Sequence, residues 1–332
     1  MTRGLNLIKP LLLWLTAGCL AYAVFGLVLG WHDFRLGLIR FPVAGIPLLA
    51  ALSLSNYLLR FGRWHLYLSR LSLEIPRRES WALFFATFAM VVTPGKLGEI
   101  YKAVHLRDRR GVPMPAGLSV VIAERLTDVL AVLLLTAAGL FWWSGALAGP
   151  TARVGAGLIV LLALASLRSG RLQHALVSRL ARSPRLRERA DEVRDTLRWL
   201  PDLTSGATAA SALLLSVAAW FCECLSLWLI CDRLGHQIGL GPAVFIYAAA
   251  TLAGSLAFLP GGLGGTEATL VLLLANLDVP HGEALSIALL VRLATLWLAV
   301  LIGVAVFAGA RRILFGGSHA DEEGPRREGA GP

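Results

Sequence analysis

A small set of charged residues stands inside otherwise apolar stretches of this chain, and these side chains are the ones that could do chemistry. A charge in an apolar, lipid-facing environment is costly, so it is expected to be paired or functional. Arginine stays protonated there, and its planar guanidinium can hold a phosphate through two hydrogen bonds. Carboxylates beside it can neutralise it or carry protons. The candidate binding residues are Lys96, Glu99, Glu124, Arg125, Asp128, Glu267 and Arg292.

Two of these carboxylates follow breaks in apolar helices. The twelve residues 81–92 rise only about 18 Å as a helix, which is short of the roughly 30 Å of a bilayer core. The sequence Thr93-Pro94-Gly95 then predicts the N-cap and first turn of a new helix. The chain repeats this device at Pro260-Gly261-Gly262. Helices that begin at such breaks direct free N–H groups into the protein, which favours a bound anion such as a lipid phosphate.

Simpler interpretations exist for each position. A glutamate in the first turn stabilises a helix start by itself, which is enough to explain Glu99 and Glu267. Glu124 and Arg125 can pair with each other at the membrane interface. Arg292 lies nine residues into the apolar run 283–310, so we expect a buried ion pair there, either functional or structural.

The composition predicts an all-α, polytopic membrane protein. Of the 332 residues, 56% are hydrophobic and only 16% charged, with a mean hydropathy of +0.68, whereas soluble domains carry about 25% charged residues. The formal net charge of +10 is explained by arginine in cytoplasmic loops. No base-contacting motif accompanies the basic residues, so we expect no nucleic-acid partner.

Apolar runs and basic loops together predict the topology. About six spans and two re-entrant hairpins are expected, although each hairpin could instead cross as two full spans. Basic residues gather in segments 62–80, 102–116 and 168–203 and after 311, which include Arg63 and Lys102. With both termini in the cytoplasm, every basic segment lies on the cytoplasmic side. The spans are 7–29, 43–61, 117–141, 154–167, 207–231 and 283–310, and the broken hairpins are 81–106 and 243–277.

The two breaks belong to an internal repeat. Pro94 matches Pro260 at an offset of 260 − 94 = 166, and Arg125 matches Arg292 at an offset of 292 − 125 = 167. Because the hairpins enter from opposite sides, the halves are predicted to be inverted, as in secondary transporters with a site at the repeat interface. The predicted division is 1–42, an N-terminal span and outer loop; 43–142, the first repeat; 143–206, a linking span and cytoplasmic segment; 207–310, the second repeat; and 311–332, a disordered tail.

Residues 171–200 have leucine and valine at helical spacing with arginine on the other face. This pattern favours a pair of amphipathic helices at the headgroup level, broken near Ser183-Pro184; a solvated linker is the alternative. The seven histidines show no metal-ligand spacing, and no nucleophile elbow or phosphate loop occurs. We therefore expect no metal, no cofactor and no enzymatic activity. A membrane-embedded enzyme using Glu99 or Glu124 as an acid–base group is the less favoured alternative.

In order and spacing, these motifs resemble the flippase-like membrane domain of the lysylphosphatidylglycerol synthases, the membrane half of the multiple peptide resistance factor. The resemblance extends over roughly residues 40–310 and rests on Thr93 to Glu99, Glu124 to Asp128, Leu259 to Glu267, and Arg292-Leu293. It implies a multi-pass protein of the bacterial cytoplasmic (inner) membrane that moves a lipid between leaflets. Only about twenty residues follow Arg312, so the synthase activity of the family is not expected here.

The leading hypothesis is thus a flippase-like transporter of an anionic or modified lipid. The alternative is an accessory membrane subunit that presents a lipid to a separate glycosyltransferase or lipid-modifying enzyme, as in hopanoid or glycolipid biosynthesis. In either case the expected partner is a membrane lipid.

Overall fold

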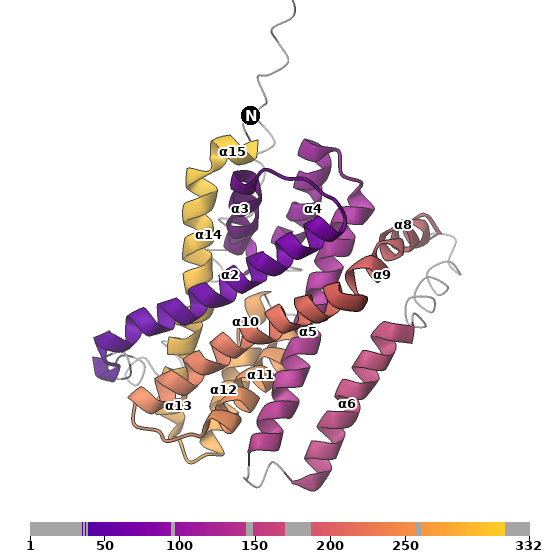
Figure 1. Cartoon of the computed structure of the whole chain (residues 1–332). Helices are drawn as coiled ribbons and strands as arrows, with labels where there is room; N and C mark the ends of the chain where they lie inside the picture. Colours follow the sequence, from indigo (N-terminus) through magenta and orange to yellow (C-terminus); the bar gives the residue numbers. More distant parts are fainter. Residues whose placement is uncertain are drawn as a thin grey trace, which may run out of the picture.

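The computed structural model of the chain describes residues 35, 37, 39–93, 97–143, 149–169, 187–256 and 260–315. Within these ranges all regular secondary structure is helical, which confirms the predicted fold class (Figure 1). Several predicted features lie outside the described residues: the first span, Pro94, Gly95 and Lys96, the break near residues 183–184, and the tail from 316 onward.

Three described helices are long and apolar enough to cross a membrane. The first is α2 (Ile46–Arg70), which continues the short η1 (Val43–Gly45), and the second is α10 (Gly206–Arg233). The third joins α13 (His281–Arg292) and α14 (Leu298–Gly309) through η7 (Leu293–Trp297), a π-helical turn. The helices α5 (Met114–Trp142) and α6 (Pro150–Ser169) match two further predicted spans.

Both predicted broken hairpins are present as pairs of short helices. The first contains α3 (Arg77–Ala86), η2 (Thr87–Met90) and α4 (Leu97–Arg110). The second contains α11 (Leu240–Leu256), η6 (Pro260–Gly262) and α12 (Gly265–Ala275). The longest limb, α11, has 17 residues and rises about 26 Å, less than the thickness of a bilayer core.

Glycine makes the second break possible. Gly261, Gly262 and Gly264 have φ angles of 63°, 68° and 84°, a left-handed conformation in which a side chain is strained. The backbone can therefore reverse here between α11 and α12. This local conformation turns the start of α12 toward the middle of the protein.

The helices pack as two interlocked groups. Helix α2 lies along α10, and the two run in opposite directions (Figure 1). Helix α5 packs against α11 of the second hairpin, where Gly139 approaches the backbone of Phe245. Helix α14 packs against η2 of the first hairpin, where Gly303 approaches the backbone of Phe88 and Ala89. Each hairpin thus lies against a long helix from the other half of the chain, and the space between the hairpins is enclosed by both.

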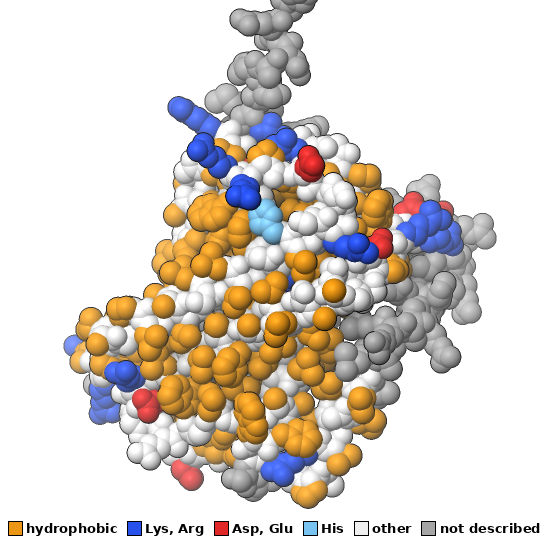
Figure 2. Space-filling model, in the orientation of Figure 1, with side chains coloured by type: hydrophobic (Ala, Val, Ile, Leu, Met, Phe, Trp, Pro, Cys, Tyr) orange, Lys and Arg blue, Asp and Glu red, His pale blue; other side chains and the backbone are white. Residues whose placement is uncertain are grey.

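The two ends of this bundle differ in charge. Helix α15 (Arg311–Phe315) packs beside α3, and Arg109 donates a hydrogen bond to the carbonyl of Ile313. Figure 2 shows Lys and Arg side chains around this end and a broad hydrophobic surface below it. At the other end, Glu283 bridges Arg40 (3.3 Å) and His236 (2.7 Å). The amphipathic α8 (Arg187–Arg198) and the short α9 (Leu200–Leu203) precede α10.

Candidate functional site

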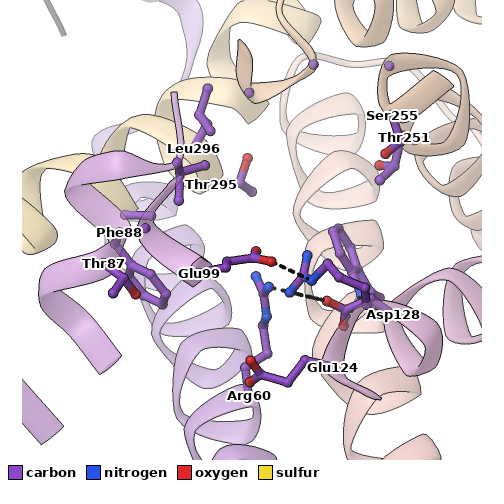
Figure 3. Close-up of a pocket in the computed structure, with 18 of the residues that line it drawn as sticks. Arg60, Thr87, Phe88, Glu99, Glu124, Asp128, Thr251, Ser255, Thr295 and Leu296 are labelled. Carbon is purple, nitrogen blue, oxygen red and sulfur yellow. Dashed lines mark hydrogen bonds and ion pairs between the residues drawn. The ribbon is translucent and has the colours of Figure 1, made fainter. Parts of the chain in front are cut away.

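A cavity of about 560 Å³ lies between the two hairpins (Figure 3). Its wall is built from α2, η2, α4 and α5 of the first half and from α10, α11, α12 and η7 of the second. In Figure 3, Arg60, Glu99, Glu124 and Asp128 point toward one another, while Thr251 and Ser255 lie across the cavity. A cavity is therefore present in the region between the two hairpins, where the sequence predicts a site.

Asp128 is the centre of the charged cluster. Its carboxylate accepts hydrogen bonds from Arg63 at 2.5 Å and from the indole N–H of Trp220 at 3.0 Å. It also pairs with Arg125 at 2.9 Å and with Arg60 at 3.4 Å. These partners come from α2, α5 and α10, so one carboxylate ties three helices together.

Two further ion pairs join α4 to α5. Arg125 lies 3.0 Å from Glu99, and Lys102 lies 3.1 Å from Glu124. The Lys102 ammonium also lies over the rings of Phe84 (4.4 Å) and Trp64 (4.8 Å), contacts that stabilise a buried cation. The first hairpin is thus fixed to α5 by one buried and one partly buried ion pair.

The second break has its own buried pair. Arg292 donates to Glu267 at 2.7 Å and to the carbonyl of Gly261 at 2.5 Å. Glu267 also accepts a hydrogen bond from the N–H of Gly264 at 2.7 Å, so its carboxylate caps the start of α12. Arg292 lines the cavity, and Glu267 is buried behind it at 1% exposure. Arg292 has the buried partner that the sequence predicts.

The structure places Glu99, Glu124, Arg125, Asp128 and Arg292 around one cavity and Glu267 beside Arg292, whereas Lys96 lies outside the described residues. It also corrects the loop assignment of two other residues. Arg63 and Lys102 were expected in basic loops, yet α2 continues to Arg70 and both side chains are buried. Arg63 is 0% exposed and pairs with Asp128, and Lys102 pairs with Glu124. In the sequence, a charged residue is taken to mark the end of an apolar span. In the fold, Arg63 and Lys102 remain inside the bundle because carboxylates of α5 neutralise them. The sequence feature that could have indicated the burial of Arg63 is the apolar face of α2, which Trp64, Tyr67 and Leu68 continue beyond it.

Another residue outside the predicted set lines the cavity. Glu223 on α10 is 7% exposed, and its carboxylate accepts a 2.6 Å hydrogen bond from the hydroxyl of Tyr247 on α11. Among the described residues no basic group lies within ion-pair distance of it. The charged residues that line the cavity are then the cations Arg60, Lys102, Arg125 and Arg292 and the acids Glu99, Glu124, Asp128 and Glu223.

The fold and site define an all-helical membrane protein with a charged internal cavity. The comparison with known families is consistent with this class: residues 13–303 match the family described as "Lysylphosphatidylglycerol synthase TM region". The chain belongs to this family, as the sequence resemblance predicts, and so to a family of membrane proteins connected with lipid metabolism. It is also 28% identical over 232 residues to a "UPF0104 membrane protein" of Methanothermobacter thermautotrophicus, a match that covers 64% of this chain and 67% of the relative.

Proposed function

We propose that the protein is a flippase-like transporter, and not an enzyme, that moves an anionic or modified lipid between the leaflets of the cytoplasmic membrane. The observation that carries the proposal is the cavity of about 560 Å³, which lies inside an apolar bundle and is lined by four cations. This volume is in the range of sites that hold small molecules. It is large enough for a lipid headgroup.

The ion pairs in the cavity suit a headgroup that arrives and leaves. When the cavity is empty, Glu99 and Asp128 neutralise Arg125, and Glu267 neutralises Arg292. A phosphate can replace the carboxylate partner of an arginine, because both groups accept the same pair of hydrogen bonds. Exchange of partners avoids leaving a bare charge in the membrane interior. The candidate binding residues are thus proposed to act as exchangeable pairs.

The rim of the cavity is apolar where the cavity opens to the outer surface of the helix bundle. Ile100 on α4 and Val129 on α5 line the cavity and are 42% and 50% exposed. Exposed apolar side chains at this opening would allow acyl chains to remain in the bilayer while the headgroup enters. This arrangement favours a lipid over a water-soluble anion.

The packing supports the inverted repeat on which the transport mechanism depends. Glu99 pairs with Arg125 in the first half and Glu267 with Arg292 in the second, at offsets of 267 − 99 = 168 and 292 − 125 = 167. Gly139 and Gly303 make the two close helix contacts at an offset of 303 − 139 = 164. We propose that the two hairpins face each other from opposite leaflets, with both termini in the cytoplasm.

Transport can be tested with purified protein in liposomes that contain a fluorescent phosphatidylglycerol. A quencher that reaches only the outer leaflet should remove about half of the fluorescence from vesicles without protein. It should remove nearly all of the fluorescence from vesicles in which the protein moves the lipid between leaflets. Arg125→Gln should slow the movement about 10- to 100-fold, because a charged hydrogen bond contributes about 1.5–3 kcal/mol. Arg233→Gln, at an exposed position outside the cavity, is the matched control. No movement of phosphatidylglycerol or of a panel of modified lipids would refute the proposal.

The second candidate, an accessory subunit that presents a lipid to another enzyme, is favoured by two observations. The family is described by the name of a lipid-modifying synthase. The amphipathic α8, which packs against α5, offers a surface for such a partner. Lipid binding without movement in the same liposomes, together with co-purification of a glycosyltransferase or lipid-modifying enzyme, would favour this function over transport.

A further inference from the structure

We propose that Glu223 is a proton-binding site, and that its protonation releases Arg60 to bind the phosphate of an anionic headgroup. The inference deepens the proposed function and rests on it. It supplies a driving ion: a proton bound at Glu223 would enter and leave the cavity together with the lipid.

The environment of Glu223 differs from that of the other acids in the cavity. Glu99, Glu124 and Asp128 each lie within 3.1 Å of a basic group. Glu223 has the neutral hydroxyl of Tyr247 instead, at 2.6 Å. A carboxylate buried in a membrane protein without a cation is expensive to keep ionised, and one proton removes that cost. Its place on the cavity wall gives the proton a route in and out.

Arg60 is the cation that is best placed to respond. Its ion pair with Asp128, at 3.4 Å, is the longest of the three that Asp128 makes, and its Nε atom is buried with no hydrogen-bond partner. Its guanidinium lies 5.7 Å from the ring centre of Trp220, three residues before Glu223 on α10. Arg60 is therefore the arginine that Asp128 holds at the greatest distance, and it lies within electrostatic reach of Glu223.

The balance of positive and negative charges around the cluster also points to Arg60 and Glu223. Four cations, Arg60, Arg63, Lys102 and Arg125, face the three carboxylates Glu99, Glu124 and Asp128. One positive charge is left, which ionised Glu223 balances from across the cavity. The titratable and charged groups on neighbouring helices that interact electrostatically with Glu223 are Tyr57 and Arg60 on α2, Asp128 on α5, Tyr247 on α11 and Arg292 on α13.

Protonation and lipid binding then become linked. With Glu223 ionised, Arg60 is attracted toward it; with Glu223 protonated, the surplus positive charge is available to a phosphate. Because coupling between two sites is reciprocal, a bound phosphate must also strengthen proton binding at Glu223. One proton is taken up and one released per cycle, and no electron moves.

The first experiment detects the proton without requiring transport. Infrared spectra of the purified protein, recorded over a pH series, should contain the band of a protonated carboxylic acid that disappears as the pH rises. Glu223→Gln should remove this band. Glu74→Gln, which changes an exposed carboxylate outside the cavity, should leave it in place. A band that persists in Glu223→Gln would overturn the assignment.

The second experiment measures coupling. Titration calorimetry with short-chain phosphatidylglycerol, in buffers of different ionisation heat, counts the protons taken up on binding. The wild type should bind more tightly as the pH falls, by up to about tenfold per pH unit, with uptake of about one proton. Glu223→Gln should bind independently of pH with no uptake, and Tyr247→Phe should move the pH dependence to higher pH because the ionised form loses its hydrogen bond.

The outcomes separate this inference from the proposed function. Tight binding that is independent of pH in the wild type would overturn the proton site and leave lipid transport standing. Binding that depends on sodium ions and not on pH would also overturn it. If the wild type binds no lipid at any pH, the proposed function fails. The infrared experiment then decides the proton site by itself. A band that is lost in Glu223→Gln supports proton binding at Glu223, and the absence of any such band in the wild type overturns it.

Discussion

Buried charges in this protein are arranged so that each arginine or lysine of the site has a carboxylate at hand. Desolvation of a charge is costly, and attraction to one partner repays it only when the geometry is good and the remaining hydrogen-bonding groups are satisfied. Asp128 meets this condition with three arginines and Trp220. Glu267 meets it with Arg292 and the N–H of Gly264. Removal of one partner should therefore be far more harmful here than at the surface.

Glu267→Gln tests this at one pair. The amide oxygen of glutamine can still accept the hydrogen bond from Gly264, so the change removes the charge and keeps the helix cap. We expect a loss of about 3–5 kcal/mol in stability, because Arg292 is left buried without a counter-charge. The measurement is the thermal unfolding midpoint in detergent. Glu283→Gln is the control, because Glu283 and its partner Arg40 are exposed, and ion pairs at such positions contribute about 0–1 kcal/mol. Equal losses from the two variants would contradict the prediction.

Helix elements hold the site through close backbone contacts. Helix α14 can approach η2 only because residue 303 is glycine; a Cβ atom there would overlap the backbone of Phe88 and Ala89. The same is true of Gly139 on α5, whose Cβ would lie 2.5 Å from the backbone nitrogen of Phe245 on α11. These contacts set the position of each hairpin, and so the width of the cavity between them.

Gly303→Ala should therefore displace η2 and destabilise the protein by about 1–3 kcal/mol, the usual cost of overpacking. Gly309→Ala, near the end of the same helix with open space around it, should be neutral or stabilising by up to about 1 kcal/mol. Unfolding midpoints of the two variants in detergent provide the comparison. A neutral Gly303→Ala would mean that this contact does not set the hairpin position.

At the scale of the whole molecule, the basic end and the opposite end define an axis along which a lipid would cross. Helix α15 and the starts of α3 and α5 lie at the basic end, while Arg40, His236 and Glu283 form ion pairs at the other. Positive residues are retained on the cytoplasmic side of membranes. The basic end is thus expected to face the cytoplasm.

Single cysteines test this orientation in a chain whose own cysteines are replaced. Asp108→Cys, at the basic end, and His281→Cys, at the other, change exposed residues. A reagent that does not cross the membrane should label position 281 from outside intact cells, and position 108 only after the membrane is opened. Labelling of both from the same side would refute the inverted arrangement of the two hairpins, and the site between them would lose its support.

Much of the fold could be predicted from the sequence because its signals are local. Apolar runs of fixed length predict spans in a bilayer, and Pro-Gly sequences such as Pro260-Gly261 predict breaks wherever the backbone must turn. The charges at Glu99, Arg125, Glu267 and Arg292 were identified as site candidates because charge is rare in such runs. None of these inferences requires knowledge of which helix packs against which.

The remainder depended on long-range packing. Arg63 finds Asp128 across 65 positions of sequence, and Asn56 donates to the carbonyl of Ala219 across 163. Whether a charged residue ends a span or is buried in it depends on the presence of such a partner. For the same reason the sequence placed Arg63 and Lys102 in loops, indicated Glu223 only as a further polar residue within a span, and did not indicate Tyr247. The sequence by itself determined that this is a helical membrane protein with two breaks and a few buried charges; only the tertiary structure decided which charges meet, because that depends on how α2, α5 and α10 pack together.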